Sequence, residues 1–302
     1  MKKFAVLLTV VAGTLWGIIG CFVRQLQEYG LSSMHIVCIR MTLSAVMFSL
    51  FILFYDRKLF KIKLRDIWCF LGSGVLSVAT FSFCYFKAIE LSSLSQASIL
   101  LYTAPIFVVL FSVILFKEKL TTVRIISLVL AFLGCVFVTG VVSGGGEFSL
   151  VAVVYGLMSG VCYALYSIFS RFALNNNYSP LTITLYTFIF SGVASLLLVD
   201  IKPICTIMTK SAYDFFYCVF FALLSSVLPY LTYTLSLKFI KSSTASIIAS
   251  IEPVVATITG AVVFSEKVPF PTGYIGIALV VLSIILINTD KKEFNAVKCK
   301  KH

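Results

Sequence analysis

Apolar runs of about 20 residues recur along almost the whole chain, and each is long enough to cross a hydrocarbon core of about 30 Å as a helix. The mean hydropathy is +1.06, and only 12% of the 302 residues are charged. Such a composition lies outside the range of soluble globular domains. Transmembrane strands would show alternating segments of about ten residues, and these are absent from the sequence. The chain is therefore predicted to be an all-α integral membrane protein.

Ten apolar segments emerge when hydropathy is averaged over about 19 residues. Short connections join them, and even the longest, 201–212, leaves no room for a separate soluble domain. The ten predicted transmembrane helices are 4–23, 34–54, 67–86, 93–116, 124–142, 149–170, 180–199, 213–237, 242–264 and 271–289.

Basic residues gather on one side of these ten segments. With the N-terminus placed in the cytoplasm, 18 of the 24 Lys and Arg residues fall on the cytoplasmic side, including five lysines of the 291–302 tail. This asymmetry follows the positive-inside rule and predicts a multi-pass protein of the cytoplasmic membrane with both termini inside the cell. The net charge of +12 is accordingly assigned to topology and to the anionic headgroups of the lipid bilayer, and not to nucleic acid.

The sequence carries no metal, disulfide or catalytic signal. The nine cysteines are scattered singly, and the two histidines, His35 and His302, stand apart at a span boundary and in the tail. The sequence has no Cys/His cluster, no nucleophile with its base and no Gly-rich phosphate loop. No cofactor, metal site or enzymatic activity is therefore expected.

The two halves of the sequence match when one is shifted by 148 residues. The segment ASILLYTAPIFVVLFSVILFKEK, which begins at Ala97, then lies on ASIIASIEPVVATITGAVVFSEK, which begins at Ala245. Each half holds five spans, so the second half enters the membrane from the opposite side. We therefore expect two inverted five-helix repeats, 1–143 and 147–290, joined through a flexible Gly-rich seam at 143–146. Inverted repeats are typical of secondary transporters, whose substrate sites lie between the repeats.

Several motifs together resemble the EamA family of the drug/metabolite transporter superfamily. They are TLWG at 14–17, RMTLSAVMF from Arg40, FCYFKAIELSSLSQAS at 83–98, and the two segments in which a proline is followed by FxEK. The resemblance spans about residues 13–287. It implies ten helices in two inverted five-helix repeats around a central cavity, and transport of small organic solutes, often amino acids or other metabolites. It names neither the substrate nor the direction of transport.

Glu252 is an acidic residue deep in an apolar span, ten or more residues from either end and so about 15 Å from the interface. A carboxylate there must face the bundle interior, be paired or be protonated. It could carry a coupled proton or bind substrate, or it could support the architecture or a gate, as a Glu-Pro shared with the family implies. Pro253, and Pro105 in the other half, each remove a backbone donor and predict helix kinks. Ala104 precedes Pro105, so the repeat is symmetric in its kinks and asymmetric in its charge.

Arg40 lies five or six residues inside the second span. It could anchor the helix at the interface, pair with Glu252 or bind a substrate carboxylate, and the sequence leaves these alternatives open.

Aromatic and hydroxyl side chains are expected to line the cavity. Ser98, Tyr102 and Pro105 share one helix face, and Ser246, Ser250 and Pro253 repeat that face in the second half. Such a lining suits a zwitterion or an organic cation, with ordinary packing as the alternative for part of the set. The remaining candidates carry polar tips that need partners inside a membrane: Trp16, Tyr85, Tyr163, Tyr166, Tyr230 and Tyr233.

These observations predict a secondary transporter of a small organic metabolite, an amino acid or a related zwitterion or organic cation. It is expected to work by alternating access, with a coupling proton and in the direction of export. An uncoupled facilitator or a channel is the alternative, although ion pores usually arise from symmetric rings in oligomers. The sequence leaves open whether the protein works alone or as a homodimer.

Overall fold

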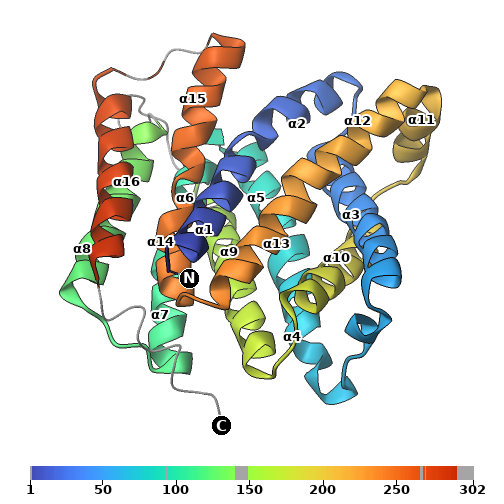
Figure 1. Ribbon diagram of the computed structural model, residues 1–302. Coiled ribbons are helices and arrows are strands. Elements are labelled where there is room, and N and C mark those ends of the chain that lie inside the picture. Colours follow the sequence, from blue (N-terminus) through green and yellow to red (C-terminus); the bar gives the residue numbers. More distant parts are fainter. Residues whose placement is uncertain (1, 93, 140–148, 266–267, 269, 291–302) are drawn as a thin grey trace.

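The computed structural model describes residues 2–92, 94–139, 149–265, 268 and 270–290, and within them all regular structure is helical. The helices form one bundle (Figure 1). The predicted seam at 143–146 and the basic tail at 291–302 lie outside the described residues.

In the first half the helices are α1 (Lys2–Gly17), α2 (Ile19–Glu28), α3 (Ser33–Tyr55), α4 (Ile67–Leu71), α5 (Thr80–Leu91), α6 (Leu94–Leu101), α7 (Ala104–Phe116) and α8 (Thr122–Val138), with short 3-10 turns at η1 (Arg57–Phe60) and η2 (Leu64–Asp66). In the second half they are α9 (Leu150–Asn175), α10 (Pro180–Leu196), α11 (Lys202–Lys210), α12 (Ala212–Ala222), α13 (Leu228–Leu237), α14 (Ser242–Ala249), α15 (Glu252–Phe264) and α16 (Thr272–Thr289). Two π-helical segments, η3 (Gly72–Ala79) and η5 (Leu223–Val227), occupy matching positions of the two halves.

Eight of these helical stretches are long and apolar enough to cross a membrane, and two shorter apolar helices, α8 and α10, complete the set among the described residues. The prediction of an all-helical membrane protein with ten apolar segments is confirmed. Segment boundaries differ in two places. The first segment bends at Ile18 and continues to Glu28 as α2, and the longest expected connection contains α11, which is anchored by the buried Ile204 and Ile207.

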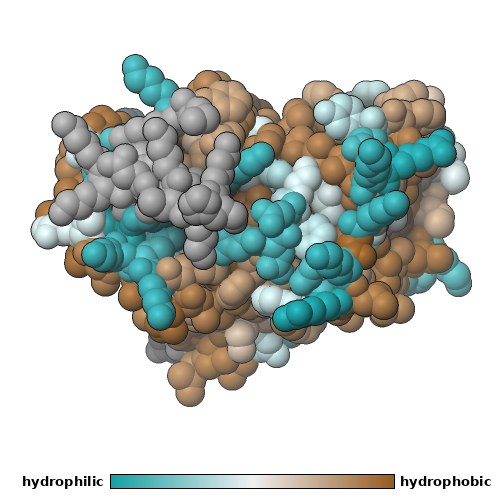
Figure 2. Space-filling view, turned by 60° about the horizontal axis from the view of Figure 1, so that its bottom comes forward, coloured by the Kyte–Doolittle hydropathy of each residue, from teal (hydrophilic) through white to brown (hydrophobic). Residues whose placement is uncertain are grey.

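The two ends of the bundle differ in charge. Lys and Arg recur in the connections 56–66, 117–121 and 238–241, which lie at one end together with 176–179. Figure 2, in which the bottom of Figure 1 comes forward, shows hydrophilic side chains gathered on this face. We call it the basic end. The connections 29–32 and 197–201 lie at the opposite end, together with the end of α15 and the start of α16.

Two of the membrane-crossing helices are interrupted at their centres. One breaks between α6 and α7 and the other between α14 and α15, so the kinks expected at Pro105 and Pro253 are interruptions of two residues each. Each proline is the second residue of the new half-helix, where its missing N–H would have had no intrahelical partner. The prolines cannot donate to the carbonyls four residues earlier, those of Leu101 and Ala249.

Glycines of the neighbouring helices face these two carbonyls. A Cβ added at Gly13 of α1 would lie 3.1 Å from the oxygen of Ala249, and one added at Gly160 of α9 would lie 3.3 Å from the oxygen of Leu101. Only a residue without a side chain allows α1 and α9 to approach so closely. The two halves thus pack against their broken helices in the same way, which supports their origin as repeated units.

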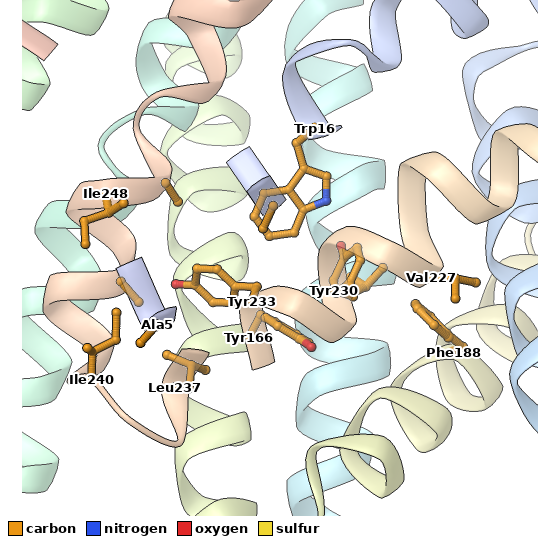
Figure 3. Packing of buried hydrophobic residues seen from close by; sticks show 14 of the residues in the cluster. Ala5, Trp16, Tyr166, Phe188, Val227, Tyr230, Tyr233, Leu237, Ile240 and Ile248 are labelled. Carbon is orange, nitrogen blue, oxygen red and sulfur yellow. The ribbon is translucent and has the colours of Figure 1, made fainter. Parts of the chain in front are cut away.

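Aromatic side chains from both halves fill the centre of the bundle (Figure 3). Trp16 of α1 lies against Tyr230 and Tyr233 of α13, with ring centroids 5.3 and 5.5 Å away. Tyr166 of α9 meets Tyr230 edge-to-face at 4.9 Å. Edge-to-face contacts of this kind fix ring positions as well as burying area. These four rings therefore form a closely packed layer at the centre of the bundle.

The close approach of α1 to α15 makes Gly17 sensitive to substitution. A Cβ there would lie 2.7 Å from the backbone oxygen of Glu252 and 2.6 Å from Cβ of Val255. Because backbone must move to accept it, Gly17→Ala should destabilise the protein by about 1–3 kcal/mol. Thermal unfolding of the purified protein should show the loss. Gly20→Ala is the matched control, since nothing lies within 4 Å of its Cβ position. Equal melting temperatures for the two variants would contradict the packing described.

Candidate functional site

A cavity of about 760 Å³ lies between the two halves. Its volume is within the range of about 300–1,000 Å³ that small-molecule sites occupy. The exposed side chains of Arg24 and Gln27 on α2, and Ser33 at the start of α3, line its outer part at the opposite end. No described residue of the connections at the basic end lines it. The cavity is therefore accessible from the opposite end and closed at the basic end.

Glu252 faces this cavity from the first position of α15. The hydroxyl of Tyr163, on α9, donates a hydrogen bond of 3.3 Å to one carboxylate oxygen. The side chain is half-buried, so the cavity reaches it. Pro253 is the next residue and also lines the cavity. Because the helix breaks before α15, Glu252 begins a new half-helix at the cavity wall.

Arg40 lies on α3 and faces the same cavity. It is only 9% exposed, and its Nε has no hydrogen-bond partner among the described residues. Arg40 and Glu252 make no ion-pair contact, although each acts electrostatically on the other across the cavity. A cation and a carboxylate thus face one space without neutralising each other directly.

Most of the side chains predicted for the cavity lie in its wall. The Tyr85 hydroxyl and Ser98 Oγ, which are 2.9 Å apart, join α5 to α6 there. Trp16 also meets Tyr163, with ring centroids 6.1 Å apart. The predicted residues that line the cavity are Trp16, Arg40, Tyr85, Ser98, Tyr102, Tyr163, Tyr230, Glu252 and Pro253.

The remaining predicted residues lie elsewhere. Tyr166 and Tyr233 are buried beneath the cavity, where their hydroxyls bond Thr234 Oγ1 at 2.5 Å and Ser167 Oγ at 2.8 Å. Pro105, Ser246 and Ser250 surround a void of about 20 Å³ between the two helix breaks, which Glu252 also borders. Helix period identifies the face on which a residue lies, but it does not separate a cavity wall from the packed layer next to it.

Part of the cavity wall carries no clear sequence signal. The bend at Ile18 turns α2 across the cavity, and no proline marks it. At the mouth, the guanidinium carbon of Arg24 lies 4.2 Å from the ring centroid of Phe264. Thr139 and Phe81 also reach the cavity. Among the described residues no three His, Cys, Asp or Glu side chains come together, so no metal site is assigned.

A helical membrane bundle whose two related halves enclose a solute-sized cavity defines the class of membrane transporters. Within that class the chain belongs to the EamA-like transporter family, whose sequence profile matches residues 3–140 and, a second time, 150–289. This is a family of transporters and not of enzymes.

Relatives and a solved structure agree with this family. An uncharacterized transporter of Archaeoglobus fulgidus is 27% identical over 95% of this chain and 99% of its own length. The uncharacterized transporter YxxF of Bacillus subtilis is 25% identical over 85% of this chain and 81% of its own. The aromatic amino acid exporter YddG of Ancylobacter novellus is 28% identical over 35% of this chain and 37% of its own. A crystal structure of another protein shares the fold, with a TM-score of 0.76 at 18% identity over 95% of this chain and 96% of that one.

Electrostatic coupling between Arg40 and Glu252 can be measured with a double-mutant cycle. Either Arg40→Met or Glu252→Gln leaves the other charge in a low-dielectric cavity without its opposite. The double variant should therefore be more stable than the sum of the single losses implies, by about 1 kcal/mol or more. Thermal unfolding of the four proteins measures the coupling.

The control is a second pair of charges at the opposite end. Lys87 and Glu90 form an ion pair of 2.8 Å between exposed side chains. Solvent screens such a pair, so Lys87→Met and Glu90→Gln should combine additively. Additive losses at Arg40 and Glu252 as well would show that the two charges do not act on each other.

Proposed function

We propose that the protein is a secondary transporter that moves a small zwitterionic metabolite, such as an amino acid, by alternating access. The proposal assigns it to the cytoplasmic membrane, with export driven by proton uptake. The observation that carries it is a cavity open at one end and closed at the other, into which Arg40 and Glu252 face separately. The repeats at 1–143 and 147–290 and the 291–302 tail are part of this proposal.

The chemistry of the cavity supports a zwitterion. The Arg40 guanidinium would bind a carboxylate with two parallel hydrogen bonds, as its planar fork favours. Glu252 would take the ammonium group, and the faces of Trp16 and Tyr163 would attract the same positive charge. An organic cation without a carboxylate meets repulsion from Arg40, and an organic anion meets repulsion from Glu252. The similarity to an aromatic amino acid exporter over a third of the chain is in keeping with this class.

The charge pattern supports an orientation. The basic end carries the Lys and Arg residues that the positive-inside rule places in the cytoplasm, so both termini would lie inside the cell. The cavity would then open to the outside. A substrate carried from the cytoplasm would leave through the mouth beside Arg24 and Gln27.

Glu252 links the substrate to the proton in this proposal. Its carboxylate can hold the substrate ammonium or a proton, and the proton removes the negative charge that attracts the ammonium. A proton arriving from outside would therefore favour substrate release, and its loss to the cytoplasm would restore the site for the next substrate. This exchange of one proton for one bound ammonium drives export when protons are more concentrated outside.

Transport by Glu252→Gln tests the coupling. In proteoliposomes the variant should exchange labelled substrate across the membrane and fail to accumulate it when a proton gradient is applied. Glutamine keeps the size and hydrogen bonding of the side chain, but it neither binds nor releases a proton. Glu90→Gln, at an exposed site, should accumulate substrate normally. Proton-driven accumulation by Glu252→Gln would exclude this residue as the proton carrier, and flux without saturation or trans-stimulation would favour a channel.

Ligand selectivity tests the two charges separately. Phenylalanine should raise the melting temperature of the purified protein more than 2-phenylethylamine, which lacks the carboxylate, or 3-phenylpropionate, which lacks the ammonium. Arg40→Met should abolish the preference over the amine, and Glu252→Gln the preference over the acid. Each lost charge-assisted contact should weaken zwitterion binding by about tenfold or more. A wild type that binds the amine as well as phenylalanine would rule out a zwitterion site and leave an organic cation as the substrate.

A further inference from the structure

The basic end of the bundle is closed by hydrogen bonds between the two halves. Ser243, at the second position of α14, donates its hydroxyl to Glu118 Oε2 at 2.5 Å. Glu118 follows the end of α7 by two residues. We propose that Glu118 and Ser243 form a lock between the two broken helices, and that its release opens the cavity to the basic end. The proposal rests on the alternating access proposed above and is independent of the substrate and of the coupling ion.

Glu118 is held in position by its own half. Lys117 adopts a left-handed conformation with φ of 53°, and the N–H of Glu118 returns to the carbonyl of Ser112 at 3.2 Å. The N–H of Lys117 returns to the same carbonyl, so this left-handed helix ending fixes the backbone that carries the carboxylate. Arg124 of α8 donates to the same Oε2 from 3.3 Å. The acceptor is thus already in position when α14 approaches.

The ion pair with Arg124 lets the lock open without stranding a buried charge. The side chains of Arg124 and Glu118 are 0% and 8% exposed. Removing the partner of a buried charge is strongly unfavourable. Glu118 keeps Arg124 when Ser243 leaves, because both belong to the first half. Among the described residues, Glu118 is joined to α14 by one hydrogen bond with a neutral hydroxyl, which water can replace at the end of the bundle.

Two further contacts surround the lock. Thr121 donates to Asp290 at 2.5 Å and so joins the start of α8 to the end of α16. Arg171 of α9 donates to the carbonyl of Ile240 and, at 3.2 Å, to Ser242, and its charge also acts on Glu118. These polar contacts lie at the end of the bundle, beside buried apolar residues such as Leu237, Ile240 and Ala245. Polar groups exchange partners with water far more readily than interlocked apolar side chains do.

The lock is connected to the substrate cavity by a short rigid element. Ser243 lies at one end of α14, and the break before Glu252 lies at the other. Movement of α14 away from α7 would move the break as well. Binding at Glu252 and closure at Ser243 would then be coupled through the movement of α14.

Amide hydrogen exchange of the purified full-length protein in lipid nanodiscs tests the lock without any substrate. Ser243→Ala should increase exchange over 242–249 by roughly tenfold, because one hydrogen bond to a carboxylate is lost. Glu118→Gln keeps the size of the side chain but also removes the carboxylate from the buried Arg124, so it should increase exchange in the same segment and in α8. The helices α10 and α12 should keep wild-type exchange in both variants. Lys119→Gln, at an exposed position of the same connection, is the matched control and should match the wild type throughout.

Two outcomes would contradict the proposed lock. Wild-type exchange over 242–249 in Ser243→Ala would overturn the proposal, and so would a uniform rise over the whole chain in both variants. Because no solute is present, a protein that carries an organic cation, or one that uses no proton, would give the same local increase. If the proposed substrate or the proton coupling were wrong, the expected increase in exchange over 242–249 would therefore be the same.

Discussion

Backbone hydrogen bonds inside a membrane have no water to replace them, and this constraint explains the centre of the molecule. Pro105 and Pro253 free the carbonyls of Leu101 and Ala249 at membrane depth. Non-helical backbone is tolerated there only where protein or a cavity covers it. Gly160 and Gly13 bring α9 and α1 against the two breaks, and the cavity lies beside them. Of the two prolines, Pro253 lines the cavity itself, and Pro105 borders the small void between the two breaks.

A second constraint acts on the two buried charges. An isolated ion in a low-dielectric interior is costly, and a direct ion pair would cancel much of that cost without leaving anything for a ligand. Arg40 and Glu252 avoid direct contact and face a shared cavity, so water or a ligand can solvate both. A zwitterion matches this arrangement because it offers opposite charges at fixed separation and adds no net charge.

Sequence patterns predicted the features that depend on composition and on order along the chain. The apolar segments, the repeat and the helix interruptions at the prolines follow from hydropathy and from missing backbone donors. Glu252 was identified because a carboxylate within an apolar membrane span is energetically costly. Tertiary details did not follow in the same way. The bend at Ile18, which turns α2 across the cavity, arises from packing. Tyr230 and Tyr233 both lie on α13, and the sequence does not tell which of them faces Ser167 and which lines the cavity. The hydrogen bond from Ser243 to Glu118 joins positions 125 residues apart, which a helix period cannot connect.

The matched residues of the two halves bear on how the two ends would alternate under the proposed mechanism. In the sequence Glu118 matches Glu266 and Ser243 matches Ser95, so both halves contribute the same pair of residue types. A carrier needs both closed states within a few kcal/mol of each other, since a ligand can shift the equilibrium only by its difference in affinity for the two states. Under the alternating access proposed above, a closure that depends on the hydrogen bond from Ser243 to Glu118 meets this condition, because one such bond contributes little to the free energy. The unmatched Glu252 breaks the symmetry at the centre alone, and a charge there can bias the alternation without favouring a permanent closure at either end.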